Sequence, residues 1–421
     1  MIPTAIFQFK MRQRACGLPS QCATGRRGAH SYLQFFAALA LASFVVLSLG
    51  CTKKAGETEA AGNATSSATD EILVGEYGSL TGGEATFGQS TDNGIQLALA
   101  ERNTAGGVKG RKIKIIALDD AGKSEEAAST VTRLITQNKV VALLGEVASS
   151  RSLAAAPIAQ SNQIPLITPA STNPKVTEVG DYIFRVCFID PFQGTVMAKF
   201  AAENLKAKKV AILRDVKSDY SVGLADFFIK KFKTLGGEIV SDASYQSGEI
   251  DFKAQLTQIR SSKPDAIFVP GYYTEVGLIA RQAKQLGITA PLMGGDGWDS
   301  SKLYEIGKEA INGGYFSNHY TTESTEPAVV EFIKKYKERF GGSTPDSMAA
   351  LGYDAANILF AAMDRSATVT PKNIRDEIAK TKDFPGVTGK ITIDANRNAN
   401  KPAVVVKVDG TVNRFVTTIS P

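Results

Sequence analysis

The sequence predicts an α/β fold with two lobes, each a mostly parallel sheet with helices on both faces, joined by multiple hinge crossovers. From Glu71 onward, short runs rich in β-branched residues alternate with stretches of helical periodicity, which is typical of parallel sheets. About 350 residues follow the first 70, more than one hydrophobic core usually holds. The alternation also forms two series, which are separated near Asp190-Pro191.

The first series predicts four strands and three helices before the break. Val131, Leu134 and Ile135 illustrate the helical spacing, because they fall on one face of their helix. The strands are expected at 71–78, 112–119, 140–145 and 165–169, and the helices at 88–104, 124–138 and 151–159.

The second series begins with a strand at Lys209 and ends with elements that both lobes must share. Its strands are expected from 209 and at 238–245, 266–270, 291–294, 389–394 and 403–408, and its helices at 219–235, 251–262, 274–286, 327–340, 346–364 and 371–381. We therefore assign residues 71–189 and about 320–388 to the first lobe, and 190–319 and about 389–421 to the second.

The N-terminus has the features of an export signal. Five basic residues and no acidic residue precede an apolar run at Phe35–Leu49, which ends at Gly50-Cys51. Residues 1–50 are thus predicted to be a lipoprotein signal peptide, and Cys51 the lipidated residue. An N-terminal anchor helix is the alternative, and either reading puts the body outside the cytoplasm. Residues 51–70 lack large apolar side chains and predict a flexible tether.

Charge and cysteine content exclude several classes. The chain has 48 basic and 42 acidic residues, but once the five basic residues of the signal are removed the remainder is close to neutral. Nucleic-acid binding needs a concentrated basic face and is not predicted. Of four cysteines, only Cys187 lies in the body, where its apolar surroundings predict an inert buried thiol rather than a reactive one.

Four turns that follow predicted strands carry the candidate site. Ser149-Ser150 begins a predicted helix, whose free N–H groups and positive end suit a carboxylate. The turn at 169–173 supplies further hydroxyls, while the turns at 271–275 and 294–298 supply tyrosines and an acid, Asp296. Since ligands bind at the carboxyl ends of strands in open α/β sheets, these turns predict a site for a zwitterion.

Each of these residues also has a structural reading. Ser149 could cap its own helix, Asp296 could be a turn acid, and Tyr272-Tyr273 could belong to the core.

Enzymatic and cofactor motifs are not found. The segment 78–83 fits neither dinucleotide nor P-loop spacing, and no G-x-S-x-G elbow occurs. His319 is the one histidine beyond the signal, which excludes His-based zinc sites; a packing or surface role is favoured over catalysis. Asp119-Asp120 is interpreted as a solvated or capping pair rather than a metal site. We predict no enzyme activity, no cofactor and no metal.

The motifs, in their order and spacing, resemble the periplasmic branched-chain amino-acid-binding proteins, the leucine/isoleucine/valine-type receptors of ABC importers, from about Ile72 to Val408. The segments that carry the resemblance are 78–82 with Phe87-Gly88, 103–110, Asp119-Asp120, 145–150, 169–173, 218–223 and 271–273. It implies the type I periplasmic-binding-protein fold.

The resemblance also implies roles for single residues. Ser149 and Thr172 would bind the ligand carboxylate, and Asp296 its ammonium group. Backbone groups of Ala170 and Ser171 would assist, and the aromatic residues that would close over the ligand are Phe87, Tyr220 and Tyr272.

Three positions depart from the family pattern. Asp296 replaces the usual glutamate and is one methylene shorter, and Phe87 stands where tryptophan is frequent. Gly122 and Ala148 occupy the places of a disulfide found in some members. The first two departures affect side-chain preference more than amino-acid binding.

We therefore expect a periplasmic, membrane-anchored lipoprotein that binds an L-amino acid, branched-chain or aliphatic, by lobe closure and delivers it to ABC-transporter permease subunits. A ligand-sensing receptor domain of a signalling system, which uses the same fold, is the alternative.

Overall fold

A computed structural model describes residues 71–420 of the chain. The predicted signal peptide, Cys51 and the tether lie outside these residues. Within 71–420, no helix is both long and apolar enough to cross a membrane.

The first sheet is entirely parallel. Its strands are β1 (Ile72–Gly78), β2 (Ile113–Asp119), β3 (Leu143–Leu144), β4 (Leu166–Thr168) and β5 (Ile183–Arg185). They lie in the order β2-β1-β3-β4-β5, and every neighbouring pair is parallel. All five strands therefore end at the same edge of the sheet.

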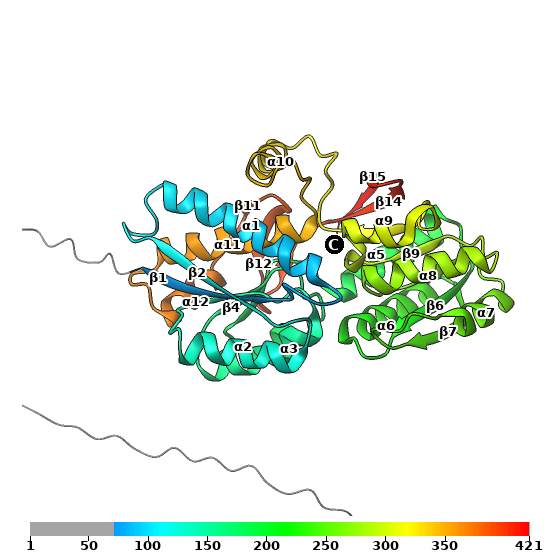
Figure 1. The fold of residues 1–421 in the computed structure, drawn as a ribbon, viewed down its shortest axis with the longest axis horizontal. Helices are drawn as coiled ribbons and strands as arrows, with labels where there is room; N and C mark the ends of the chain where they lie inside the picture. Colours follow the sequence, from blue (N-terminus) through cyan, green and yellow to red (C-terminus); the bar gives the residue numbers. More distant parts are fainter. Residues whose placement is uncertain (1–70, 421) are drawn as a thin grey trace, which may run out of the picture. The chain divides into compact units, whose positions relative to one another are not determined.

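Helices cover both faces of this sheet (Figure 1). One face packs against α1 (Ala85–Thr104) and α11 (Ser347–Arg365), the other against α2 (Ser124–Thr136) and α3 (Ser149–Ser161). Residues that alternate along β1 go to opposite cores, because successive side chains of a strand point to opposite faces: Val74 joins the α1 and α11 side and Tyr77 the α2 and α3 side.

The second sheet has seven strands in the order β15-β14-β10-β9-β8-β6-β7. The strands are β6 (Lys209–Asp215), β7 (Glu238–Tyr245), β8 (Ala266–Phe268), β9 (Leu292–Gly294), β10 (Tyr315–Asn318), β14 (Ala403–Asp409) and β15 (Val412–Ile419). The part from β7 to β10 is parallel, whereas β14 and β15 are antiparallel to their neighbours.

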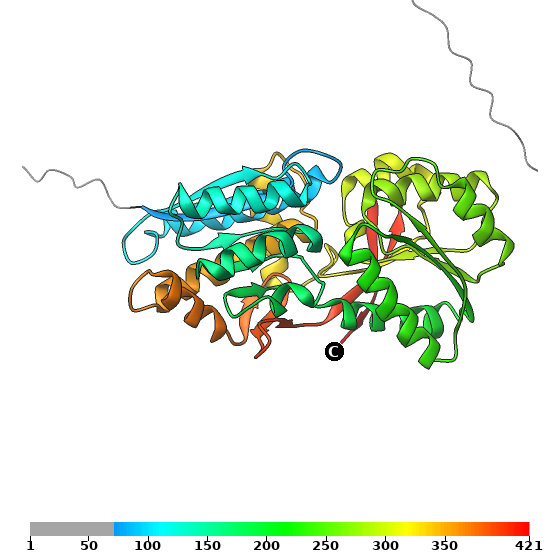
Figure 2. The same ribbon diagram turned by 90° about the horizontal axis from the view of Figure 1, so that it is seen from below.

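Helices also flank both faces of the second sheet (Figure 2). One face is covered by α5 (Asp190–Lys199) and α6 (Asp219–Thr234), and the other by α7 (Lys253–Ser261), α8 (Tyr273–Gln285) and α9 (Ser301–Gly307). A π-helical turn, Phe200–Asn204, continues α5.

The last helices return to the first sheet. Helix α11 packs along α1, with α10 (Pro327–Arg339) beside α1 and α12 (Pro371–Ala379) beside α11. A small antiparallel sheet follows, with strands β11 (Phe384–Gly386), β12 (Gly389–Ile393) and β13 (Ala399–Asn400). The chain thus passes between the two sheets near 186–190, 318–321 and 400–403.

The contacts of the small sheet indicate where the last boundary between the lobes lies, which the sequence analysis placed at 389. Asn398 contacts Thr177, since the Thr177 hydroxyl donates to Asn398 Oδ1 at 2.9 Å. The Arg185 amide likewise donates to the Arg397 carbonyl at 3.2 Å. These contacts favour a boundary near 402 for the last crossover; the lobe assignment as a whole stays a prediction.

The predicted fold class is confirmed, and the predicted elements of both series are found with small shifts at their ends. The sequence analysis missed elements that are short or lack a clear period, chiefly α5, β10 and β15.

Candidate functional site

Except for Phe87, which lies in the first turn of α1, the predicted ligand residues lie where parallel strands end. Ser149 is the first residue of α3, after β3, and Thr172 follows β4. Tyr220 opens α6 after β6, and Tyr272 precedes α8 after β8. Asp296 begins a 3₁₀ turn that Gly295 alone separates from β9. The carboxyl ends of the strands of both sheets thus supply the site, as expected for open α/β sheets.

The turns of the two sheets meet at this edge. The Asp219 amide donates to Ser150 Oγ at 2.9 Å, and the same hydroxyl lies 2.9 Å from the Asp219 carboxylate. Asn173 Nδ2 donates to the Asp219 carbonyl at 2.8 Å. On the other side, the Thr274 hydroxyl donates to the Gly83 carbonyl at 2.8 Å. The predicted ligand residues are consequently enclosed between the two sets of turns.

Ser149 does not cap its own helix. Its hydroxyl accepts a hydrogen bond from the Asn173 amide at 3.2 Å, and Ala148 occupies the N-cap position. Ser149 therefore joins the two hydroxyl-rich turns, and the capping alternative is wrong. The Ser171 hydroxyl is likewise used inside the turns, because it reaches the carbonyls of Glu146 and Val147 at 3.0 Å.

Thr172 differs from its neighbours. Its side chain is fully buried, and Oγ1 makes no well-formed hydrogen bond within residues 71–420. The hydroxyl lies near the Asp190 carboxyl and lowers the pKa of that acid. Thr172 thus has an incompletely bonded hydroxyl at the point where the resemblance predicts a ligand carboxylate.

Asp296 is held by three side chains. Gln193 Nε2 and the Tyr220 hydroxyl donate to its Oδ1 at 2.8 and 3.0 Å. His319 Nε2 lies 2.9 Å from Oδ2. Burial lowers the pKa of His319, so the ring is neutral at physiological pH, and Nε2 donates because a carboxylate only accepts. His319 also stacks on Phe188, with 3.9 Å between ring centroids.

The predicted aromatic residues form one cluster. Tyr220 and Tyr272 stack with ring centroids 5.3 Å apart, and Phe87 meets Tyr272 edge to face at 5.4 Å. Tyr273 joins on the other side of Phe87 at 4.9 Å. Such contacts contribute about 0.5–1.5 kcal/mol beyond area burial. These ring contacts connect α1 of the first sheet with the starts of α6 and α8 of the second sheet.

Sequence reasoning missed Asp190, the first residue of α5. Its carboxylate is fully buried and neither oxygen makes a well-formed hydrogen bond among the described residues. Burial raises the pKa of Asp190 to about 8; the nearby Thr172 hydroxyl opposes this rise, and the Asp296 carboxylate adds to it. The same helix carries Gln193, whose Oε1 is also buried and unpartnered in this part of the chain. The signal available in the sequence was the spacing of Asp190 and Gln193, because residues three apart lie on one face of a helix.

Sequence reasoning also missed a buried group of ion pairs around Arg151. Arg151 pairs with Glu84, and its Nη1 lies 3.7 Å from Glu146 Oε1. Glu146 in turn accepts from the Ser79 amide and hydroxyl at 3.1 and 2.6 Å. The Arg151 guanidinium is adjacent to Gly122, where a Cβ atom would approach it at 3.4 Å. An ion-pair network therefore lies at Gly122, one of the two positions at which the resemblance implies a disulfide in other members.

The two acids at the end of β2 have different environments. Asp119 accepts from the Thr81 hydroxyl at 2.6 Å and holds the 80–81 turn, which agrees with a capping role. Asp120 is fully buried and accepts from the Gly122 amide at 2.9 Å, so of the two interpretations the solvated one was wrong and the capping one agrees. Burial and the Glu146 charge raise the pKa of Asp120 to about 7. Across 71–420 no cluster of three or more His, Cys, Asp or Glu residues is arranged to hold a metal ion.

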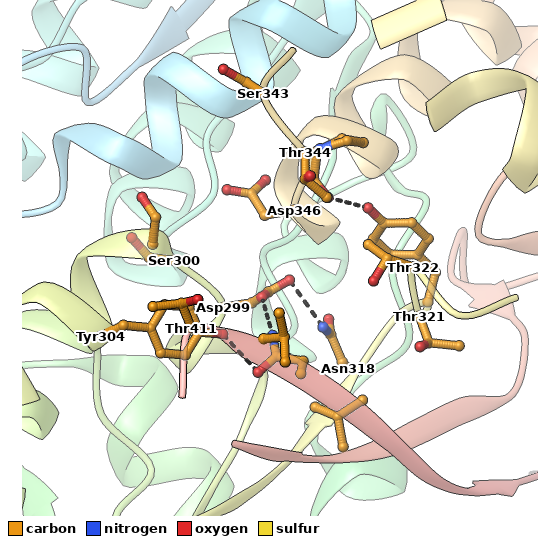
Figure 3. Close-up of a pocket in the computed structure, with 16 residues that line it drawn as sticks. Asp299, Ser300, Tyr304, Asn318, Thr321, Thr322, Ser343, Thr344, Asp346 and Thr411 are labelled. Carbon is orange, nitrogen blue, oxygen red and sulfur yellow. Dashed lines mark hydrogen bonds between the residues drawn. The ribbon is translucent and has the colours of Figure 1, made fainter. Parts of the chain in front are cut away.

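A cavity of about 410 Å³ lies near the crossovers but contains none of the predicted ligand residues. Its acids are Asp299 and Asp346, which are already partnered. Asn318 Nδ2 donates to Asp299 at 2.9 Å (Figure 3), and the Ser90 hydroxyl donates to Asp346 at 2.7 Å. This cavity is consequently a weaker candidate than the closed edge between the sheets.

Comparisons with known proteins agree with the geometry. A family model described as periplasmic binding protein matches residues 71–412. A Leu/Ile/Val-binding protein of Rhizobium johnstonii is 32% identical over 327 residues, which cover 76% of this chain and 87% of that protein. An amino acid binding protein of Pseudomonas aeruginosa is 34% identical, covering 72% and 80% respectively.

Two solved structures have the same fold. The leucine binding protein of Thermotoga maritima is 44% identical with a TM-score of 0.80, covering 83% of this chain and 99% of its own. The substrate binding protein of a branched-chain amino acid transporter from Streptococcus pneumoniae, solved with isoleucine, is 35% identical with a TM-score of 0.79, covering 83% and 100%. These matches confirm the resemblance that the motifs indicated and the type of lobe that the sequence predicted.

Proposed function

The chain belongs to the periplasmic binding protein family, and on that premise we propose that it captures a branched-chain or other aliphatic L-amino acid by lobe closure. Its relatives are solute receptors of amino-acid transport, not enzymes. We further propose that it delivers the amino acid to the permease subunits of an ABC importer.

One observation carries the proposal: anion-binding and cation-binding groups are buried at the same closed edge. The Thr172 hydroxyl makes no well-formed hydrogen bond in the described residues and can donate to a carboxylate, and it lies beside the turn that Ser149 stabilises. The acids Asp190 and Asp296 can offset an ammonium charge, and both are buried. A zwitterion satisfies both kinds of group at once, whereas a simple acid or a simple amine satisfies one.

The aromatic cluster supports an aliphatic side chain on the ligand. Phe87, Tyr220 and Tyr272 offer ring faces and edges without a free charge at that end of the site. Burying an aliphatic side chain against such rings gains about 1.5–3 kcal/mol. The shorter acid at 296 leaves more room on the ammonium side than a glutamate would.

Closure itself supplies the mechanism. In an open form, the first-sheet turns carrying Ser149 and Thr172 would bind the carboxylate. The second-sheet turns would then add Tyr220 and Tyr272, and the ligand would stabilise the closed form through these additional contacts. Lipidation at Cys51 would keep the receptor at the periplasmic face of the membrane, close to the permease.

A thermal-shift screen of the full-length protein tests this proposal. Each L-amino acid is compared with its D-enantiomer, and a ligand at a hundredfold excess over its Kd should stabilise the protein by about 2.7 kcal/mol. We expect the largest shifts with leucine, isoleucine and valine. No shift with any L-amino acid, together with a shift by a carboxylate that lacks an amine, would refute amino-acid capture.

A further inference from the structure

The second sheet and its helices carry a concentration of basic side chains at one end. This basic end comprises the segments 203–209, 230–238, 260–265 and 284–290, which contain nine basic and three acidic residues. The basic residues are Lys206, Lys208, Lys209, Lys230, Lys231, Lys233, Arg260, Lys263 and Lys284. All are exposed except Lys231, which is half-buried. Residues 71–421 as a whole contain 41 basic and 39 acidic residues, so the body outside the basic end is net negative.

Hydrogen bonds join the four segments into one surface. The amide of Lys208 donates to the Asp265 carboxylate at 2.8 Å, and the Glu238 amide donates to the Lys208 carbonyl at 2.8 Å. Arg260 Nη1 donates to the Leu286 carbonyl at 2.9 Å. The basic end is therefore continuous from the start of β6 to the end of α8.

The basic end faces away from the first sheet. Strands β6, β8 and β9 are parallel, and the turns at their carboxyl ends meet the turns of the first sheet. The amino ends of these strands and the last turns of α6, α7 and α8 consequently lie at the opposite end of the second sheet, which is on the right of Figure 1. The length of the sheet separates the basic end from the candidate ligand site.

Neighbouring acids do not balance these basic side chains. Within residues 71–420, none of the nine forms an ion pair with an acid, whereas Lys380 at the end of α12 pairs with Glu377 at 2.8 Å. Helix dipoles favour lysine in the last turn of a helix, but Lys206, Lys208 and Lys209 precede β6. A field of unpaired like charges attracts an anionic partner.

The composition of the basic end favours a lipid surface over a protein partner. Protein interfaces are depleted in lysine and enriched in arginine and aromatic residues. The basic end has eight lysines and one arginine, and its one aromatic residue, Phe232, is fully buried. Ammonium groups act as point charges and suit headgroups that have no fixed geometry. Leu235, which is 38% exposed among these lysines, adds an apolar side chain that can enter the headgroup region.

We propose that the basic end binds an anionic phospholipid surface. Such a contact leaves the closed edge accessible, because that edge lies at the carboxyl ends of the same strands. Together with the lipid predicted at Cys51, the basic end would hold the body at the membrane at two points. Two linked attachments bind more tightly than either does alone, because the first raises the effective concentration of the second.

Vesicle co-sedimentation of the full-length chain tests the proposal. The parent protein carries Cys51→Ala, so that no lipid on the protein contributes to binding. Vesicles of phosphatidylcholine alone are compared with vesicles that contain phosphatidylcholine and phosphatidylglycerol in equal amounts. The parent should bind the mixed vesicles more strongly, and this preference should disappear at about 1 M salt, where the Debye length falls to about 3 Å.

A triple variant assigns the binding to the basic end. Lys208→Gln, Lys230→Gln and Lys233→Gln together should weaken binding to the mixed vesicles by about 100-fold, because each lysine near an anionic surface contributes about fivefold. All three side chains are exposed, so the variant should melt at the temperature of the parent.

A second triple variant is the matched control. Lys334→Gln, Lys337→Gln and Lys382→Gln together remove the same charge from exposed lysines outside the basic end. This control should bind the mixed vesicles as the parent does. Equal weakening in both triple variants would show that net charge governs binding, and it would overturn the role of the basic end.

A tryptophan probe separates lipid contact from attraction at a distance. Trp298 is the one tryptophan of the chain and is fully buried, so added emission reports the new position. The emission of Leu235→Trp should shift to the blue with mixed vesicles and stay unchanged with phosphatidylcholine alone. Val330→Trp puts the same probe on α10, where Val330 is 52% exposed, and its emission should not shift.

Three results would overturn the proposal. The first is equal binding of the parent to the two kinds of vesicle. The second is an unshifted emission of Leu235→Trp on mixed vesicles that the parent binds. The third is binding of soluble polyglutamate that the basic-end triple variant loses, without any preference of the parent for the mixed vesicles; it would assign the surface to an acidic protein instead.

Discussion

Replacing Thr172 with valine should separate ligand binding from stability more cleanly than any other change at the site. The substitution removes the hydroxyl and keeps the branched shape. Because Oγ1 of Thr172 makes only an imperfect contact with Asp190 and no well-formed hydrogen bond among the described residues, its loss should cost the ligand-free protein less than the roughly 1–3 kcal/mol of an unpaired buried group.

The effect on binding follows from the hydrogen bond that the ligand carboxylate would lose. Hydrogen bonds to charged groups contribute about 1.5–3 kcal/mol. At about 1.4 kcal/mol per factor of ten, Thr172→Val should raise the Kd for leucine by about 10- to 150-fold. Titration calorimetry gives the Kd, and differential scanning calorimetry without ligand gives the stability.

Ser149→Ala is the matched comparison. Ser149 Oγ is the partner of the Asn173 amide, so its removal leaves a buried N–H group unpaired and should cost about 1–3 kcal/mol without any ligand. The reasoning would be refuted if Thr172→Val lowered the ligand-free melting temperature as much as Ser149→Ala while the leucine Kd stayed at its native value.

Three further outcomes are expected. Arg151→Met leaves Glu84 and Glu146 buried without their cation and should lower the free energy of unfolding by about 3–5 kcal/mol; a loss below 1 kcal/mol in urea unfolding would contradict this. The pKa of Asp120 is raised to about 7, so the folded state binds more protons than the unfolded state between pH 4 and 7 and loses stability as pH rises through that range. Asp120→Asn should reduce this loss, and an unchanged pH profile of unfolding would argue against it. Cys51→Ala should release the protein from membranes into the soluble fraction, whereas retention with an uncleaved N-terminus would indicate an anchor helix.

The sequence predicts the parallel part of the fold because that part is governed by local patterns. Strands such as β6 and helices such as α2 combine apolar periodicity with clear ends. Helix α5 escapes prediction because its apolar residues have no single face: it is buried on several sides, between β10 and α6. Strand β15 is missed for the opposite reason, since much of it is exposed at a sheet edge.

The residues of the site can be predicted where they follow strands that the sequence itself reveals. Ser149, Thr172, Tyr272 and Asp296 stand in turns after recognisable strands, so topology alone brings them to one edge. His319 follows a short strand, β10, that the sequence analysis did not identify. Arg151 could not be distinguished from a solvated residue, because its partner Glu84 is distant in sequence and meets it only through the fold.

Asp190 shows why the remaining part of the site depends on tertiary structure. In the sequence, an acid before proline at a break between two series reads as a helix start on the surface. In the structure the same residue is buried at a crossover, close to a second acid that three donors already stabilise. Two buried carboxylates without a cation oppose closure, and a proton or an ammonium group removes that opposition.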